Sequence, residues 1–89
     1  MKQYFYNGSI YFEGEFFNGQ KNGKGIEYDF DGNIQYEGEY LNGNRHGKGK
    51  EYYDGKLIFE GEYLYGEKIK GKFFINEKLE YEGEFINKL

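Results

Sequence analysis

The sequence contains no cysteine, proline or tryptophan, and it also lacks alanine, valine and threonine. Without cysteine it can form neither a disulfide framework nor a thiolate metal site, which excludes a disulfide-stabilised secreted mini-protein. No apolar run reaches the length of a signal peptide or a transmembrane helix, so we expect a soluble, cytoplasmic protein. The net charge of −4 argues against sequence-independent nucleic-acid binding, which depends on Lys and Arg neutralising phosphates.

Glycine, tyrosine and phenylalanine instead fill 35 of the 89 positions. Glycine is unfavourable inside helices and aromatic side chains favour strands, so this composition predicts an all-β fold. A chain of this length has room for one domain with a thin core. Its stability must therefore come from strand pairing and aromatic packing.

One short motif recurs along the chain. An aromatic residue, Glu, Gly, Glu and a second aromatic residue begin at Phe12, Tyr36, Phe59 and Tyr81, with spacings of 24, 23 and 22 residues. A second element, Gly-Lys-Gly or Lys-Gly followed by a turn pair, lies between the copies. Self-similarity at a fixed short period is typical of repeat architectures. Residues 1–89 therefore form a single array, with units starting near residues 12, 36 and 59 and half units at residue 81 and over residues 1–11.

Each unit is predicted to contain two β-strands. Alternation with a period of two places an aliphatic residue, an aromatic residue, glycine and a second aromatic residue on one face of the first strand, and glutamates on the other. Asp-Gly pairs predict tight hairpin turns at one end, whereas glycine-rich segments such as residues 18–23 predict longer loops at the other. We expect about eight strands, near residues 2–6, 10–17, 24–30, 34–41, 48–53, 57–64, 70–75 and 79–86.

The predicted architecture is an elongated, twisted, single-layer antiparallel meander built from β-hairpin repeats. With about 4.8 Å between neighbouring strands, the sheet is roughly 35–40 Å long. The eight strands could instead close around a ligand, but repeated glycines on the apolar face would leave such an interior underfilled. We therefore favour the open sheet.

These motifs resemble the MORN repeat family. The aromatic-Glu-Gly-Glu-aromatic core, the Asn-Gly after it, the Gly-Lys-Gly and the Asp-Gly before the next unit carry the resemblance over residues 4–87. The linker before each aromatic residue is one residue longer than usual, as in variants from bacteria and protists. The third unit also departs from the pattern, with Ile69-Lys70-Gly71 in place of residues 46–49 and Glu77 where a turn glycine is expected. We expect a tighter or irregular hairpin there.

The resemblance implies a twisted antiparallel sheet that serves as a spacer, a dimerisation platform or a docking surface. Attachment to anionic phospholipid is also attributed to the family. In larger proteins the repeats accompany another functional part.

No motif predicts catalysis, a cofactor or a metal site. Four equivalent glutamate pairs indicate a solvated face that pairs with lysines of neighbouring strands, because an active site is normally built once. His46 is the only histidine, and no cysteine is present to help it bind zinc. Residues 29–33 lack the later glutamate of a calcium loop. We therefore expect a protein that is not an enzyme and needs no cofactor.

The aromatic stripe predicts a protein-interaction surface, because a single-layer sheet cannot cover its own apolar face and large exposed apolar patches mark interfaces. Packing of the rings over glycines of adjacent strands is the alternative use of the stripe. We predict a non-catalytic scaffolding module that binds partners through its strand edges and through an aromatic face formed by Phe12, Phe16, Tyr36, Tyr40, Phe59, Tyr63, Tyr81 and Phe85.

Basic residues near the glycine-rich segments suggest a second function. A peripheral membrane adaptor would use them to attract anionic lipid headgroups. We favour the alternative, in which they solubilise loops and offset the glutamates. The candidate lipid-binding residues are Lys21, Lys24, Arg45, Lys48 and Lys70.

Self-association is a further expectation, because the first and last strands are edges with unpaired backbone groups. We predict a homodimer, formed either by edge pairing or by face-to-face burial of the aromatic stripes.

Overall fold

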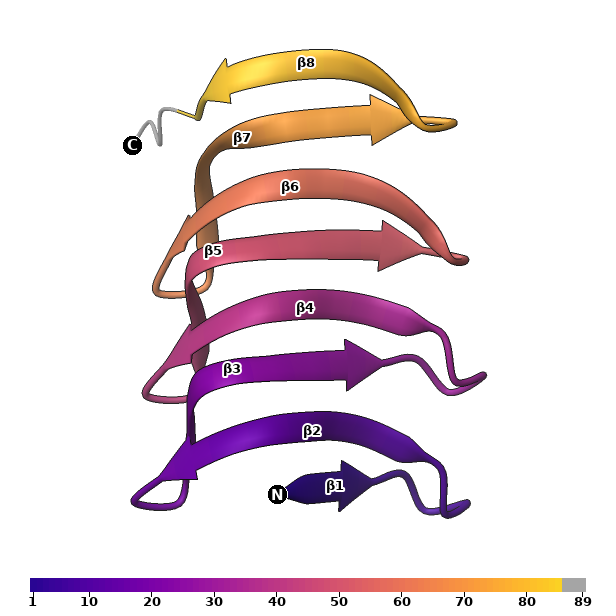
Figure 1. The fold of residues 1–89 in the computed structure, drawn as a ribbon, viewed down its shortest axis with the longest axis vertical. Helices are drawn as coiled ribbons and strands as arrows, with labels where there is room; N and C mark the ends of the chain where they lie inside the picture. Colours follow the sequence, from indigo (N-terminus) through magenta and orange to yellow (C-terminus); the bar gives the residue numbers. More distant parts are fainter. Residues whose placement is uncertain (86–89) are drawn as a thin grey trace.

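The computed structural model describes residues 1–85, which form a single eight-stranded antiparallel sheet (Figure 1). The strands are β1 (Lys2–Tyr4), β2 (Ile10–Phe17), β3 (Gln20–Tyr28), β4 (Ile34–Leu41), β5 (Asn44–Tyr53), β6 (Lys56–Leu64), β7 (Glu67–Ile75) and β8 (Lys78–Glu84). Their order in space is their order in the chain, and β1 does not pair with β8. The predicted open, all-β meander is therefore confirmed. Residue 86, which the sequence placed at the end of the last strand, lies outside the described residues.

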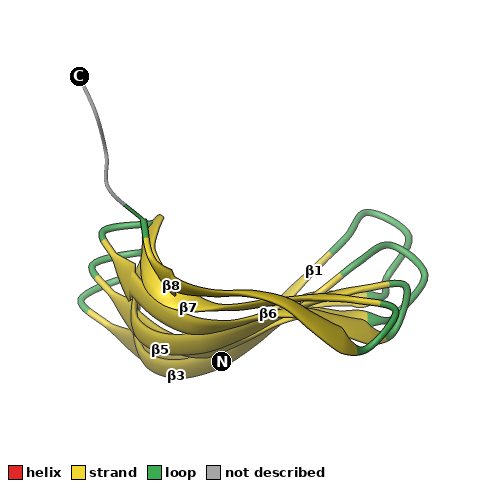
Figure 2. Ribbon diagram, turned by 90° about the horizontal axis from the view of Figure 1, so that it is seen from above, coloured by secondary structure: helices red, strands yellow, loops and turns green. Residues whose placement is uncertain are grey.

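The longest dimension of the molecule runs across the strands (Figure 1) and measures 36 Å, against 29 and 22 Å in the other directions. This length agrees with eight strands at ordinary β-sheet spacing. The strands are bent, and the sheet has a trough-like cross-section when seen along its long axis (Figure 2).

The hairpins at the end where longer loops were expected are tight. Both residues of each connection have positive φ, in the pairs Asn18-Gly19, Asn42-Gly43 and Tyr65-Gly66. Two-residue turns of this conformation match the twist of the flanking strands. The prediction of longer loops is wrong here, because the residues assigned to them belong to strands that start at Gln20, Asn44 and Glu67.

The opposite end contains the only five-residue connections among the described strands, at residues 5–9 and 29–33. Its other two turns, Asp54-Gly55 and Asn76-Glu77, have two residues each, again with positive φ at both positions. The hairpin expected to be irregular at Glu77 thus keeps the same turn geometry as its neighbours, with a glutamate at φ 68° where Gly55 has φ 80°.

A bulge interrupts the pairing where the strands bend. In the β2·β3 ladder, Gly14 pairs with Gly25 but Phe16 pairs with Lys21, so β3 contributes two additional residues. The carboxylate of Glu15 accepts a hydrogen bond from the backbone N–H of Lys24 at 2.8 Å, which satisfies a donor that the bulge frees. Glu39 and Lys48 repeat this contact at 2.8 Å.

The third unit has a smaller bulge. In β6·β7, Glu62 pairs with Lys70 and Tyr63 with Lys68, which leaves Ile69 as the single extra residue. The shortened segment noted in the sequence therefore changes the bulge and leaves the turn intact.

A row of glycines crosses the sheet beneath the aromatic rings. One glycine from each of β2 to β8 pairs with the next, in the order Gly14, Gly25, Gly38, Gly49, Gly61, Gly71 and Gly83. A Cβ atom on Gly25 would lie 2.5 Å from Cζ of Phe12, closer than side-chain carbons approach each other. The missing side chains therefore make room for the rings to lie flat on the sheet.

Candidate interaction surface

The aromatic face is largely buried within the chain. Phe12, Tyr36 and Phe59 are 0% exposed, and Tyr40 and Tyr63 are 5% and 2% exposed. Successive rings meet edge to face with centroids 5.3–5.6 Å apart, as aromatic pairs prefer. Packing of rings over glycines, the alternative left open by the sequence, accounts for these five residues.

The remaining three predicted residues of this face are more accessible. Phe16 and Phe85 are half-buried, and Tyr81 is 47% exposed. Tyr81 occupies the same position in its unit as Phe12, Tyr36 and Phe59. The aromatic face is therefore open at its β8 end.

A cation covers the ring of the first aromatic residue in each complete unit. The ammonium of Lys21 lies 4.4 Å from the ring centre of Phe12. The guanidinium of Arg45 lies 4.3 Å from the ring of Tyr36. Lys68 takes the same position over Phe59 at 5.3 Å in the third unit. These contacts are within cation–π range, so the odd-numbered strands supply a lid for the rings of the preceding even-numbered strands.

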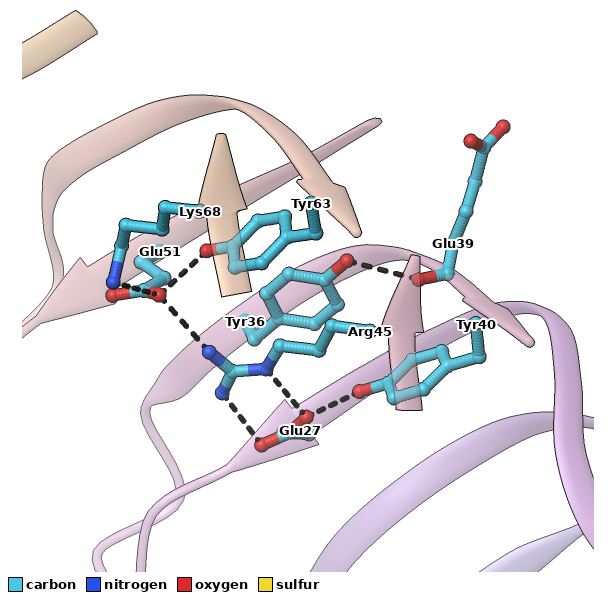
Figure 3. Close-up of polar contacts among 8 residues, drawn as sticks. All are labelled: Glu27, Tyr36, Glu39, Tyr40, Arg45, Glu51, Tyr63 and Lys68. Atoms are coloured by element: carbon cyan, nitrogen blue, oxygen red, sulfur yellow. Dashed lines mark hydrogen bonds and ion pairs between the residues drawn. The ribbon is translucent and has the colours of Figure 1, made fainter. Parts of the chain in front are cut away.

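Arg45 is the centre of a polar network on the aromatic face (Figure 3). Its guanidinium forms a two-point ion pair with Glu27, with contacts of 2.9 and 3.1 Å. A third hydrogen bond of 3.0 Å joins it to Glu51, which also pairs with Lys68 at 2.9 Å. Because the four residues come from β3, β5 and β7, the network ties the three units together.

Tyrosine hydroxyls complete the network. Tyr40 donates to Glu27, and Tyr63 donates to Glu51 at 2.5 Å. Both hydroxyls belong to second aromatic residues of the motif. In the last unit Phe85 takes the place of the tyrosine and Phe73 takes the place of the glutamate. The centres of their two rings lie 5.4 Å apart.

The network shifts the pKa values of its members. Burial raises the pKa of Glu27, but hydrogen bonds from Arg45 and Tyr40 outweigh it and hold that pKa below its ordinary value. Burial also raises the pKa of Glu51, but hydrogen bonds from Tyr63 and Lys68 outweigh this effect and hold that pKa below its ordinary value. Both carboxylates are therefore charged at neutral pH.

Burial also raises the pKa of Tyr36 to about 12. For Tyr40 and Tyr63, burial and the neighbouring carboxylates together raise the pKa above the ordinary value. These hydroxyls therefore stay protonated at neutral pH and can donate to the carboxylates.

The opposite face carries alternating glutamates and lysines. Cross-strand neighbours there have opposite charge, as in Glu37 with Lys50 and Glu60 with Lys72. The pairing of glutamates with lysines that the sequence predicted is present in the register. Three adjoining hollows of about 660, 420 and 390 Å³ run along this face, lined by these side chains and by glycines of the row.

The candidate lipid-binding residues do not form one patch. Lys21 and Arg45 lie on the aromatic face, over rings. The others lie on the charged face, each opposite a glutamate of the next strand, in the pairs Lys24 with Glu39, Lys48 with Glu62 and Lys70 with Glu84. Lys70 also lies 3.6 Å from Glu62.

Sequence reasoning missed the role of Glu27 and Glu51. The signal was available, because each lies two residues after a glycine of the row and so shares the face of the aromatic stripe. The pattern does not identify the hydrogen-bond partner, because Tyr40 and Glu27 are 13 residues apart in the chain and lie on different strands.

Comparison with known families decides the identity of this repeat. The MORN repeat model matches residues 12–34 and 36–56, which are the first two complete units of the array. The chain belongs to the MORN repeat family. Its third MORN-type unit, beyond the matched residues, keeps the glycine row and the cation-covered ring.

No curated protein matches this MORN-repeat chain. MORN repeats are generally non-catalytic interaction modules. Residues 1–85 contain neither a group of metal-binding side chains nor a helix with the length and apolar character needed to cross a bilayer.

Proposed function

We propose that this MORN-repeat chain is a non-catalytic scaffolding module that binds proteins through its strand edges and the accessible end of its aromatic face. The observation that carries the proposal is the exposure of Tyr81, 47% against 0% at the three equivalent positions. Within residues 1–85, β8 pairs with β7 on one side only. An exposed ring beside such a strand edge supplies both apolar contact area and backbone hydrogen-bonding groups. The half-buried Phe73 and Phe85 extend the apolar surface next to it.

A second copy of the chain is one proposed partner. Antiparallel pairing of β8 with its counterpart would bring glutamates of the two copies together, because Glu82 and Glu84 share one face and one edge strand. Face-to-face packing of the exposed aromatic end is therefore the favoured form of the homodimer.

Sedimentation equilibrium tests this self-association with a matched pair of variants. Tyr81→Glu places a charge on the proposed contact, whereas Tyr53→Glu makes the same change at a tyrosine that is 75% exposed on another strand. We expect the original chain and Tyr53→Glu to dimerise at high micromolar concentration and Tyr81→Glu to remain monomeric. A monomeric original chain at that concentration would refute the homodimer.

The peripheral membrane adaptor is the competing proposal and has less support, because Lys24, Lys48 and Lys70 each face a glutamate. Co-sedimentation with anionic and with zwitterionic vesicles tests it. The scaffold proposal predicts no binding that depends on Lys24, Lys48 and Lys70. Salt-sensitive binding to anionic vesicles alone, lost when the three lysines become glutamates, would replace it with the adaptor. The cytoplasmic location stays a prediction in both cases.

A further inference from the structure

Every even-numbered strand that has a following strand pairs with it by the same rule. The second aromatic residue of β2, β4 and β6 lies opposite a basic residue, in the pairs Phe16 with Lys21, Tyr40 with Arg45 and Tyr63 with Lys68. The glycine of the motif lies opposite a glycine. The glutamate before that glycine lies opposite Ile26, Lys50 or Lys72.

Strand β8 presents the same residues on its outer edge. Tyr81-Glu82-Gly83-Glu84-Phe85 repeats the motif of the other even-numbered strands, but among the described residues β8 pairs only with β7. Tyr81 already has the orientation of its buried counterpart. Its hydroxyl donates to the carbonyl of Glu84 at 3.1 Å, as that of Tyr36 donates to Glu39 at 3.0 Å.

We propose that the outer edge of β8 binds an extended segment of a partner protein with the residue pattern of β5: a basic residue, then Lys-Gly, then a second basic residue. The inference rests on the proposed scaffolding function and names the partner's chemistry. Main-chain hydrogen bonds to β8 give the segment its affinity, and contacts to every second side chain give specificity.

The ring of Tyr81 selects for glycine in this segment by steric exclusion. In the internal β4·β5 pair, a Cβ atom on Gly49 would lie 2.5 Å from Cε1 of Tyr36. A partner residue opposite Gly83 meets the Tyr81 ring in the same way, so only glycine fits without displacing the ring. The N-terminal strand of a second copy does not satisfy this requirement. Met1 pairs through its backbone with Gly14, and so occupies the position that Gly25 has opposite Gly38.

The glutamates of β8 select for basic residues in the segment by charge. Lysines of β5 flank the glutamates of β6, and lysines of β7 face them from the other side. On β8, as far as the structure describes the chain, Glu82 and Glu84 face Lys72 and Lys70 on the inner side only. A basic residue on the outer side completes the alternation of charge, which favours a basic segment over an acidic one.

Disulfide trapping tests the proposal, because the chain has no cysteine of its own. The probe is a synthetic peptide with the sequence of residues 44–53, carrying Lys50→Cys, mixed with the folded full chain carrying Glu82→Cys. The internal equivalent of this pair is Glu37 opposite Lys50, and directly opposed strand residues are close enough for a disulfide. A peptide carrying Glu51→Cys instead is the out-of-register control, since that side chain points to the other face.

In a glutathione redox buffer we expect the in-register disulfide to exceed the control by about tenfold or more at equilibrium. Adding Gly49→Val to the in-register peptide reduces trapping by about tenfold, because the valine side chain strikes Tyr81. Unmodified peptide competes with trapping by the original Glu82→Cys chain. Trapping that is equal in both registers, unchanged by Gly49→Val, or absent would overturn the proposal.

Controls separate this proposal from the proposed function. Circular dichroism verifies that Glu82→Cys is folded, and an Asp31→Cys chain, altered in a distant loop, measures non-specific trapping. Dimerisation through Tyr81 without trapping of the peptide would support the scaffolding function and refute this partner. Trapping of the peptide by a chain that stays monomeric would support this partner and refute the homodimer.

Discussion

At the residue scale, glycine and aromatic residues act as a pair. Phe12, Tyr36 and Phe59 reach 0% exposure in a single-layer sheet because each ring occupies the volume that a glycine side chain would need. A cation from the next strand then covers the ring. Burial thus depends on three residue types in register across two strands.

The pairing of Tyr36 with Gly49 is testable by a double-mutant cycle. Gly49→Ala alone should lower the free energy of unfolding by about 1–3 kcal/mol, because its Cβ overpacks the Tyr36 ring. In a Tyr36→Leu background the same substitution should cost less, since the ring is gone. Equal costs in the two backgrounds, measured by urea denaturation, would show that the glycine does not accommodate the ring.

Charged residues on the aromatic face follow a matching rule. The second aromatic residue is tyrosine where it meets Glu27 or Glu51, and phenylalanine where it meets Phe73. Each hydroxyl is thus present where an acceptor is present, as buried polar groups require.

The pH dependence of stability tests the contribution of Glu27. Its pKa is lower in the folded state, so the unfolded state binds more protons in acid. Its stabilisation is complete above its ordinary pKa of 4.5 and is lost as the pH falls through the lowered value. Glu27→Gln should cost about 1–3 kcal/mol at neutral pH, and less in acid. The exposed Glu80→Gln serves as control, and a Glu27→Gln cost that stays constant into acid would contradict the assignment.

At the scale of the element, turn conformation determines where strands begin. Dense glycines in residues 18–23 suggested a loop, yet Asn18-Gly19 suffices as a turn because both residues adopt positive φ. The other glycine of that segment, Gly23, lies in the bulge at φ 102°. The sequence pattern counts glycines but cannot tell a turn glycine from a bulge glycine, which is why the strand starts at Gln20 and Asn44 were predicted too late.

Glu77 offers a stabilising substitution in one of these turns. A glutamate at φ 68° bears the steric cost of the left-handed conformation, which glycine avoids. Glu77→Gly should raise the free energy of unfolding by about 0.5–1 kcal/mol after the greater flexibility of the unfolded chain is counted. Gly55→Ala, at φ 80° in the equivalent turn, should act in the opposite direction. Denaturant midpoints check both, and a lower midpoint for Glu77→Gly would contradict the turn geometry.

At the scale of the whole molecule, the repeat determined most of what was predictable. A period of two placed both aromatic residues of the motif on one face, and the recurring motif predicted eight strands in chain order, as observed. The aliphatic residue before the motif was assigned to the same face wrongly, because the pairing shifts by one residue between Tyr36, opposite Glu27, and Ile34, opposite Tyr28. The exposure of the aromatic face was not predictable in this way. Alternation tells which face Tyr36 occupies, but its burial depends on Arg45 in the next strand and on the register between them.

The open edge of β8 is the central claim, and amide hydrogen exchange in dilute solution tests it most directly. Strand β5 has a neighbour on each side, so its amides should exchange slowly. The amides of β8 that do not bond to β7 should exchange fast, near the rate of an unstructured chain. If every amide between Lys78 and Glu84 were as protected as those of β5, the edge would be covered in the isolated chain and unable to bind a partner strand.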